Sequence, residues 1–225
     1  MPAPEALAFD MYGTLVDPVR IWKKLEHSIP AGAVRVAEVW RQKQLEYTFR
    51  LTAMERYEDF AEVTRKALDY ALADAQGQLS AAQKDELMAQ YNNLECFLDV
   101  EPGLQALQAA GHAMMVFSNG SPSMLSAIME AANLNRYFSG FVSVDDVKVF
   151  KPAPQVYQLA ANRLGRPIGE VRLISSNPFD IVGAQAAGMQ AAWIDRSGGL
   201  FDTLGPRPPL VVSTLVELAE ALAAS

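Results

Sequence analysis

The stretch ALAFDMYGTL, residues 6 to 15, decides the fold of this chain. Its first four residues are apolar and predict a buried strand that ends at the carboxylate of Asp10. A glycine and a hydroxyl side chain, Gly13 and Thr14, follow where the chain would turn away from a sheet. Open α/β sheets bind their ligands beyond the carboxyl ends of the strands. Asp10 is therefore the first candidate for a functional residue.

Three further polar groups stand at comparable places along the chain. Ser118 follows the apolar run 113–117, and Lys151 comes directly before a proline. The triplet Ser175-Ser176-Asn177 follows the run 171–174, which is mostly apolar. If these runs are parallel strands, their carboxyl ends share one edge of the sheet, and the four groups lie near one another.

The rest of the second half alternates between short apolar runs and helical patterns. Strands are predicted at 114–117, 141–144, 173–174, 191–194 and 210–212, and helices at 104–110, 154–164, 179–187 and 214–223. Ser121-Pro122 suits the start of another helix, and the proline-rich run 205–209 predicts a surface loop. Such alternation is typical of a doubly wound parallel sheet, so the predicted class is α/β.

Residues 21 to about 93 show only helical spacing, with apolar residues three and four apart and Ser80 placed to start a helix. We therefore predict an all-helical unit inserted after the first strand. The expected boundaries are 1–16 and 98–225 for the catalytic core and 17–97 for the inserted unit, which we call the cap.

Composition excludes several classes of protein. Half of the residues are hydrophobic, and the formal net charge is −7 without a basic stripe, which argues against nucleic-acid or anionic-membrane partners. No apolar run reaches about 18 residues, and the N-terminus has no positive flank, so neither a membrane span nor a signal peptide is expected. The single cysteine, Cys96, suits a reducing compartment. A cytoplasmic soluble enzyme is expected.

The four groups at residues 10, 118, 151 and 175–177 together resemble the active site of the haloacid dehalogenase superfamily, over essentially the whole chain. Many members are magnesium-dependent phosphatases with a second Asp two residues after the nucleophile. Here that position is Tyr12, a phenol that titrates near about 10. Asp180 is the only carboxylate in the segment 175–180, although hard cations need oxygen ligands. No metal and no cofactor are therefore expected.

The chain is more similar to the L-2-haloacid dehalogenase branch, because it carries Trp40-Arg41-Gln42-Lys43-Gln44-Leu45-Glu46-Tyr47 together with Ser175-Ser176-Asn177. The resemblance implies a Rossmann-like core with a helical cap, a small 2-haloacid substrate and a homodimer built through cap helices. It implies hydrolysis of (S)-2-haloalkanoic acids to (R)-2-hydroxyalkanoic acids through an ester on Asp10. A phosphatase, a fluoroacetate-specialised dehalogenase and a non-enzymatic binding scaffold stay open as alternatives.

The resemblance also implies the role of each catalytic residue. Asp10 would be the nucleophile, with Lys151 keeping it charged and Thr14 donating a hydrogen bond to it. Arg41 would receive the departing halide. The residues implied to position or activate the water that cleaves the ester are Ser175, Asn177 and Asp180, with Tyr157 hydrogen-bonding into the site.

For substrate binding, the resemblance implies that Ser118 and the Asn119 amide hold the carboxylate. The residues implied to line the halogen and alkyl pocket are Tyr12, Gln42, Leu45, Phe60, Asn177 and Phe179, and the resemblance also implies that Met11 and Arg41 bind the substrate. The chain departs from the branch at Phe179, where Trp is frequent and Pro178 precedes it, and at Phe150, where Tyr is usual. These departures leave the preferred halogen and chain length open.

Each of these residues also has an ordinary structural interpretation. Asp10 and Thr14 suit a turn or a helix cap, and Asp180 suits the first turn of a helix, where its charge would interact with the helix dipole. The remaining cases are Lys151 as a solvated lysine, Ser118 as a strand-end serine, and Leu45, Phe60 and Tyr157 as core residues.

Overall fold

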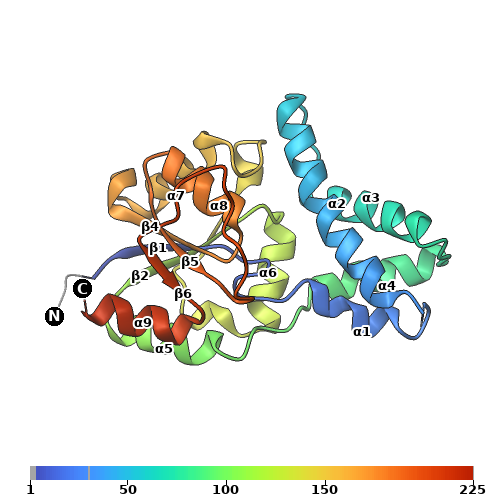
Figure 1. Ribbon diagram of the computed structural model, residues 1–225, viewed down its shortest axis with the longest axis horizontal. Coiled ribbons are helices and arrows are strands. Elements are labelled where there is room, and N and C mark those ends of the chain that lie inside the picture. Colours follow the sequence, from blue (N-terminus) through green and yellow to red (C-terminus); the bar gives the residue numbers. More distant parts are fainter. Residues whose placement is uncertain (1–3, 30, 225) are drawn as a thin grey trace.

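The computed structural model describes residues 4–29 and 31–224 and contains a six-stranded parallel sheet in the order β3-β2-β1-β4-β5-β6 (Figure 1). The strands are β1 (Ala6–Phe9), β2 (Ala113–Ser118), β3 (Phe141–Ser143), β4 (Val171–Ser175), β5 (Gln190–Ile194) and β6 (Leu210–Val212). This confirms the predicted doubly wound, Rossmann-like α/β class.

β1 lies in the middle of the sheet and pairs with β2 on one side and β4 on the other. Leu7, Ala8 and Phe9 are completely buried, which explains why this strand is a continuous apolar run without alternation. The chain builds the sheet outward from β1 in one direction through β2 and β3, and in the other through β4 to β6. The point where this order reverses lies between β1 and β4, so the ends of these two strands open the crevice in which such folds bind ligands.

The core helices cover both faces of the sheet. They are α5 (Val100–Ala109), α6 (Pro122–Ala131), α7 (Pro154–Leu164), α8 (Pro178–Ala186) and α9 (Leu215–Ala224). α7 and α8 lie above the sheet in Figure 1, and α5 and α9 lie below it. The helix predicted from residue 104 begins earlier, at Val100, because Pro102 falls in its first turn, where a proline is tolerated.

Between β1 and α5, the described residues form helices and two isolated bridges but no strand of the sheet. The cap helices are α1 (Trp22–Leu25), preceded by a 3₁₀ turn at Val19–Ile21, α2 (Ala33–Ala53), α3 (Phe60–Asp74) and α4 (Ala81–Tyr91). Asp59 caps α3, and Ser80 begins α4 with a capping box to Gln83. None of the helices in the described part of the chain is long and apolar enough to cross a bilayer.

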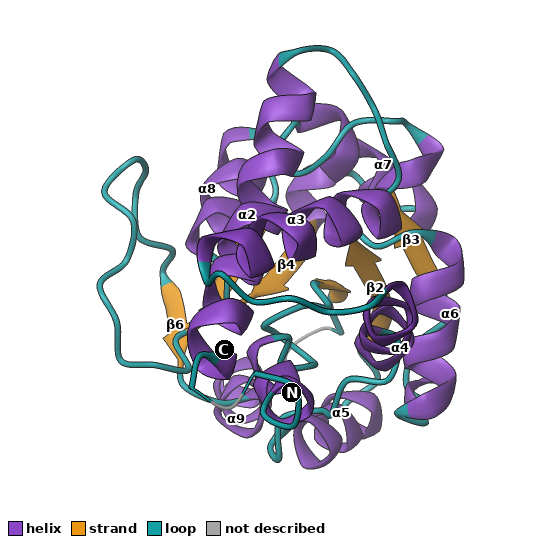
Figure 2. Cartoon of the chain, turned by 90° about the vertical axis from the view of Figure 1, so that its right-hand side faces the viewer, coloured by secondary structure: helices purple, strands orange, loops and turns teal. Residues whose placement is uncertain are grey.

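The cap lies over the carboxyl edge of the sheet, and α2 and α3 cross in front of the strands when the molecule is viewed from the cap side (Figure 2). Two segments carry the chain between core and cap, residues 14–17 and residues 95–99, and we call them the crossing segments. They are paired: the Asp17 amide donates to the Glu95 carbonyl at 3.1 Å, and the Phe97 amide to the Leu15 carbonyl at 3.1 Å. The cap boundaries at residues 17 and 97 stay a prediction.

Candidate active site

The Asp10 carboxylate, 5% exposed, lies directly after β1 at the reversal point of the sheet. Its two oxygens have different surroundings. Oδ2 accepts hydrogen bonds from Thr14 Oγ1 at 2.9 Å, Asn177 Nδ2 at 2.7 Å and Ser175 Oγ at 3.5 Å. Oδ1 faces Lys151 Nζ at 3.3 Å. Oδ2 is therefore held by several donors, whereas Oδ1 has the freer lone pairs.

Lys151 is buried to 1% exposure between the two carboxylates of the site. Its ammonium donates to Asp10 Oδ1 at 3.3 Å, to Asp180 Oδ2 at 2.8 Å and to the Phe117 carbonyl at 2.9 Å. The Asn119 side-chain oxygen accepts from the Lys151 amide at 3.0 Å and fixes the backbone of this loop. A lysine ammonium has three donor hydrogens, and all three have acceptors here. The solvated-lysine interpretation is wrong.

Asp180 lies in the first turn of α8 and is completely buried. Tyr157 donates its hydroxyl to Asp180 Oδ1 at 2.8 Å. Burial raises the pKa of the Asp180 carboxyl; Lys151 opposes this rise, and the nearby charge of Asp10 adds to it. Burial, followed by the charge of Asp180, also raises the pKa of Tyr157 well above its ordinary value. The pair thus joins a carboxylate that is more basic than usual to a phenol that stays protonated.

Arg41 is the cap residue that reaches into this site. It projects from α2, and its Nη2 donates to the Tyr12 carbonyl at 3.1 Å and approaches Asn177 Oδ1 at 3.5 Å. Its Nη1 donates to Gln44 Oε1 at 2.7 Å. The guanidinium therefore spans from the cap to both loops that surround Asp10.

Gln44 is a site residue that the sequence analysis missed. It is completely buried, donates to Thr64 Oγ1 at 2.7 Å and accepts from Tyr91 Oη at 3.0 Å as well as from Arg41. One indication of this role was present in the sequence, because Gln44 lies three residues after Arg41, on the same face of a helix. Gln44 connects Arg41 to α3 and α4, so three cap helices support the guanidinium.

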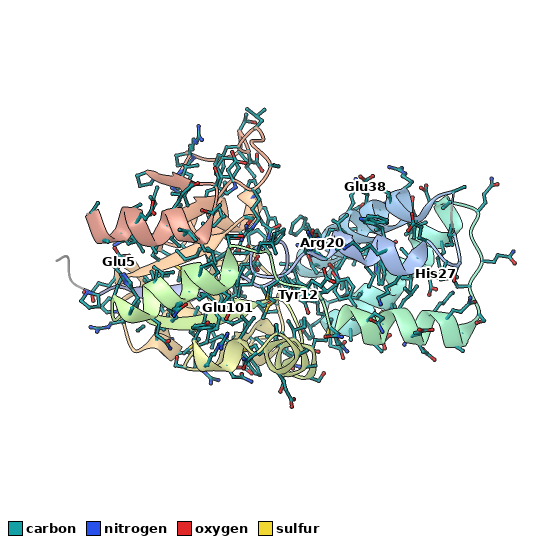
Figure 3. All side chains as sticks on the ribbon, turned by 90° about the horizontal axis from the view of Figure 1, so that it is seen from below. Glu5, Tyr12, Arg20, His27, Glu38 and Glu101 are labelled. Atoms are coloured by element: carbon teal, nitrogen blue, oxygen red, sulfur yellow. The ribbon has the colours of Figure 1, made fainter. Side chains whose placement is uncertain are left out.

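Aromatic side chains form the wall beside Asp10. The Tyr12 ring packs against Phe60 at 5.3 Å and Tyr91 at 5.6 Å between centroids, and its buried hydroxyl has no hydrogen-bond partner among the residues that the structure describes. Figure 3 shows Tyr12 where core and cap meet, with Arg20, His27 and Glu38 on the cap side. Burial raises the pKa of Tyr12 well above its ordinary value, so this phenol is a neutral wall residue.

The predicted carboxylate-binding pair lies at the end of β2, the strand that pairs with β1. Ser118 ends β2 and is completely buried, and its Oγ accepts from the Gly120 amide at 3.1 Å. Asn119 is 6% exposed. Met11 is completely buried beside Asp10 in the chain. All three stand at carboxyl ends of neighbouring strands, as predicted.

The structure brings most of the predicted residues together, but Gln42 is exposed on α2 and Leu45 is half-buried. Phe179 is half-buried and packs edge-on against Phe49 of α2, with ring centroids 5.1 Å apart. It therefore forms a second contact between core and cap near Asn177.

A cavity of about 290 Å³ lies beside this site, between the cap and the core. Its walls include Gly13, Arg41, Asn177, Trp193 and Arg196. The volume is of the order of a small organic ligand site.

Both carboxylates of the site already have a cationic partner. In the described residues, no group of three or more His, Cys, Asp or Glu side chains is placed to hold a metal ion. The two carboxylates of the site, Asp10 and Asp180, instead share the ammonium of Lys151. Mg²⁺ and Ca²⁺ take oxygen ligands. The carboxylate oxygens that could serve as such ligands here are already paired with the Lys151 ammonium.

Comparison with known proteins identifies relatives along most of the chain. The family model described as haloacid dehalogenase-like hydrolase matches residues 4–188. The chain is 35% identical over 222 residues to an (S)-2-haloacid dehalogenase of Pseudomonas sp. (strain YL), covering 97% of this chain and 96% of that protein. It is 41% identical over 192 residues to (S)-2-haloacid dehalogenase 1 of Pseudomonas sp. (strain CBS-3), covering 85% and 84%.

A solved structure of similar fold is L-2-haloacid dehalogenase from Xanthobacter autotrophicus with chloropropionic acid covalently bound. It superposes with a TM-score of 0.91 at 32% identity and covers 98% of this chain and 99% of that one. In that relative, therefore, a haloacid-derived group is attached to the protein.

Proposed function

The chain belongs to the haloacid dehalogenase-like hydrolases, and from this premise we propose that it is a metal-independent (S)-2-haloacid dehalogenase. It converts (S)-2-haloalkanoic acids to (R)-2-hydroxyalkanoic acids in two steps. The observation that carries the proposal is the buried Asp10, paired with Lys151 from the core and faced by Arg41 from the cap. The names of the relatives and the covalent complex of one of them support this reaction.

In the first step, Asp10 Oδ1 attacks the carbon that carries the halogen. Oδ1 is the nucleophilic atom because the lone pairs of Oδ2 are occupied by Thr14 and Asn177. A C–O bond forms, the carbon–halogen bond breaks, and the halide leaves with the bonding electrons. Displacement from the opposite face inverts the carbon, which converts an S substrate into an R product.

Arg41 receives the halide in this proposal. The guanidinium is permanently charged and more weakly hydrated than an ammonium, which suits a large, soft anion. Its contacts with the Tyr12 carbonyl and Gln44 hold it in place without a neutralising carboxylate among those partners. Ser118 and the backbone amide of Asn119 hold the substrate carboxylate on the other side, as the family resemblance implies.

In the second step, water attacks Cγ of Asp10 and Asp180 takes its proton. Asp180 suits this task because its raised pKa makes it a better base than an exposed carboxylate. As the water oxygen adds, negative charge develops on Oδ2, where Thr14, Ser175 and Asn177 already donate. These donors are thus preorganised for the charge of the tetrahedral intermediate. The bond from Cγ to Oδ1 then breaks, Asp180 returns the proton to the departing oxygen, and the hydroxy acid leaves with an oxygen of Asp10. The re-formed carboxyl group of Asp10 releases its proton to solvent.

Metal independence rests on the same geometry. The Lys151 ammonium supplies the positive charge between Asp10 and Asp180. It keeps Asp10 ionised before attack, since a nearby opposite charge favours the charged form of a carboxyl group.

We further propose a cytoplasmic homodimer. Val34, Met54 and Tyr70 are apolar or aromatic cap residues with exposed fractions of 49%, 57% and 42%. Association through the cap would cover them. Cys96, a free thiol, suits a reducing compartment. Sedimentation of the purified chain checks the dimer.

The deciding experiment measures halide release from each enantiomer of 2-chloropropionate, with and without excess chelator, and phosphate release from an aryl phosphate with magnesium. We expect chloride from the S enantiomer only, (R)-lactate as product, and no effect of the chelator. Asp10→Asn, which has nearly the same size, is the matched inactive control. Chloride from neither enantiomer, or phosphate release that depends on magnesium, would refute the proposal. A fluoroacetate arm distinguishes the fluoroacetate-specialised alternative.

A further inference from the structure

Arg196, which follows β5, ties together the two crossing segments at the root of the cap. Its Nη1 donates to Asp99 Oδ1 at 2.7 Å, and its Nη2 donates to the Thr14 carbonyl at 2.7 Å. The face of the guanidinium stacks on Phe97, 4.0 Å from the ring centroid. Phe97 and Asp99 belong to the segment that returns from the cap, and Thr14 belongs to the segment that enters it.

One of these contacts leads to Asp10, and another leads to a core helix. Thr14 donates its hydroxyl to Asp10 Oδ2 at 2.9 Å and accepts from the Ser176 amide at 2.9 Å. Asp99 uses its second oxygen to accept from the Leu215 amide at 2.8 Å, which anchors it to α9. Arg196 therefore links the backbone of a residue that touches the nucleophile to a rigid part of the core.

The arrangement differs from a surface ion pair. The side chains of Arg196 and Asp99 are 14% and 15% exposed. Burial alone would raise the pKa of Asp99, but the hydrogen bonds from Arg196 and Leu215 outweigh it and lower the pKa below its ordinary value. The planar guanidinium donates from two separate nitrogens to acceptors in different segments while its face stacks on Phe97, a combination that the compact ammonium of a lysine does not offer.

We propose that Arg196 is a positioning residue of the dehalogenation reaction. By clamping both crossing segments, it holds Thr14 against Asp10 and keeps the cap, with Arg41, in register with the core. This inference rests on the proposed function for its catalytic consequence, but the clamp itself is a property of the fold. Small displacements of reacting groups slow catalysis by about 10- to 100-fold, and a loss of this size is expected without the clamp.

Arg172→Ala provides a matched control for Arg196→Ala. Arg172 donates to both oxygens of Glu5 at 2.6 and 3.0 Å, and its side chain is also 14% exposed. It lies near the start of β4, at the end of the sheet opposite to Asp10. Both variants lose a largely buried ion pair, so the Tm of both should fall. Only Arg196→Ala should also lower kcat/KM for (S)-2-chloropropionate, by at least about tenfold. Arg196→Lys retains the charge beside Asp99 and should recover Tm more than kcat/KM.

Hydrogen exchange gives a readout that does not depend on activity. The amides of Asp17 and Phe97 bond across the crossing segments, and the Ser176 amide bonds to Thr14. These amides should exchange faster in Arg196→Ala and at the wild-type rate in Arg172→Ala. Should Arg196→Ala not fold, the Lys variant carries the same comparison.

The outcomes separate the two proposals. Wild-type protein that releases no halide refutes the proposed function, and the exchange of the three amides then decides whether the clamp exists. If Arg196→Ala matches Arg172→Ala in kcat/KM and leaves this exchange unchanged, Arg196 is an ordinary structural residue and the inference is overturned.

Discussion

Replacing Lys151 by Met removes the ammonium that pairs with both Asp10 and Asp180. Methionine has a similar length and no charge, so the change leaves little empty volume. The two carboxylates then stay buried, at 5% and 0% exposure, without their counter-ion. Breaking a buried ion pair typically costs about 3–5 kcal/mol in the free energy of unfolding. Because one ammonium serves two carboxylates here, we expect a loss near the upper end of this range at alkaline pH.

The loss should depend on pH in a defined direction. Lys151 lowers the pKa of Asp180, so its removal raises that pKa further above the value of about 3.9 in the unfolded chain. Between these two values the folded variant binds a proton that the unfolded chain has released. Its stability is therefore greatest below the unfolded pKa and is lost as the pH rises through the folded pKa. The difference in the free energy of unfolding between variant and wild type should narrow as the pH falls from about 9 to about 5.

Urea unfolding of both proteins across this pH range measures the gap. Lys148→Met is the matched control, because Lys148 lies three residues before Lys151, pairs with Asp145 and is 60% exposed. Such exposed pairs contribute little, so its stability should follow the wild type at every pH. A gap for Lys151→Met that stays constant from alkaline to acid pH would refute the reasoning, since it would mean that Asp180 does not titrate in response to Lys151.

Three further predictions concern the chemistry. Asp180→Asn should form the ester but not cleave it. After reaction with (S)-2-chloropropionate, mass spectrometry should therefore find the Asp10 peptide heavier by the added 1-carboxyethyl group. An unmodified peptide after release of one equivalent of chloride would contradict this. Arg41→Lys should lower the rate of chloride release by about 10²–10³-fold with the fold intact. The control Arg35→Lys, on the exposed face of the same helix, should leave the rate unchanged. Equal rates of chloride release in the two variants would remove Arg41 from the reaction. Tyr157→Phe removes a hydrogen bond that lowers the pKa of Asp180. In single-turnover measurements, the acid limb of the pH–rate profile for ester hydrolysis should therefore move to higher pH. A shift to lower pH would contradict the assignment of Asp180 as the base.

The elements that carry their own start and stop signals were predicted well. α7 matches the predicted range 154–164 because Pro154 occupies its first turn and Gly165, with φ of +65°, ends it. α5 was predicted to begin too late, since Pro102 and Gly103 suggested a break. Position 103 requires a glycine inside the helix because Leu215 of α9 packs so closely that a Cβ at residue 103 would lie 2.4 Å from the Leu215 Cβ. That requirement comes from another helix and leaves no mark on the local sequence.

The candidate site likewise contains some features that the local sequence indicates and others that arise only from packing between distant segments. The strand-end positions of Asp10, Ser118 and Ser175 follow from the pattern of apolar runs, because parallel strands end at one edge. The family resemblance supplied Arg41, but nothing in its own segment indicates which cap residues support it. Gln44 and Arg196 depend on partners far away in the chain, Tyr91 and Thr14, and such contacts exist only once segments distant in the sequence have packed together.

The cap enters and leaves the core through neighbouring crossing segments, and this has an evolutionary consequence. The core holds Asp10, Lys151 and Asp180, which we propose as the nucleophile, its counter-ion and the base, while the cap contributes Arg41 and much of the aromatic wall. Because the Asp17 amide and the Glu95 carbonyl lie within 3.1 Å, helices between them can be lengthened, exchanged or remodelled without moving the strands. Mutations in the cap can thus alter which substrate is admitted, while the core residues proposed to carry the chemistry are inherited unchanged.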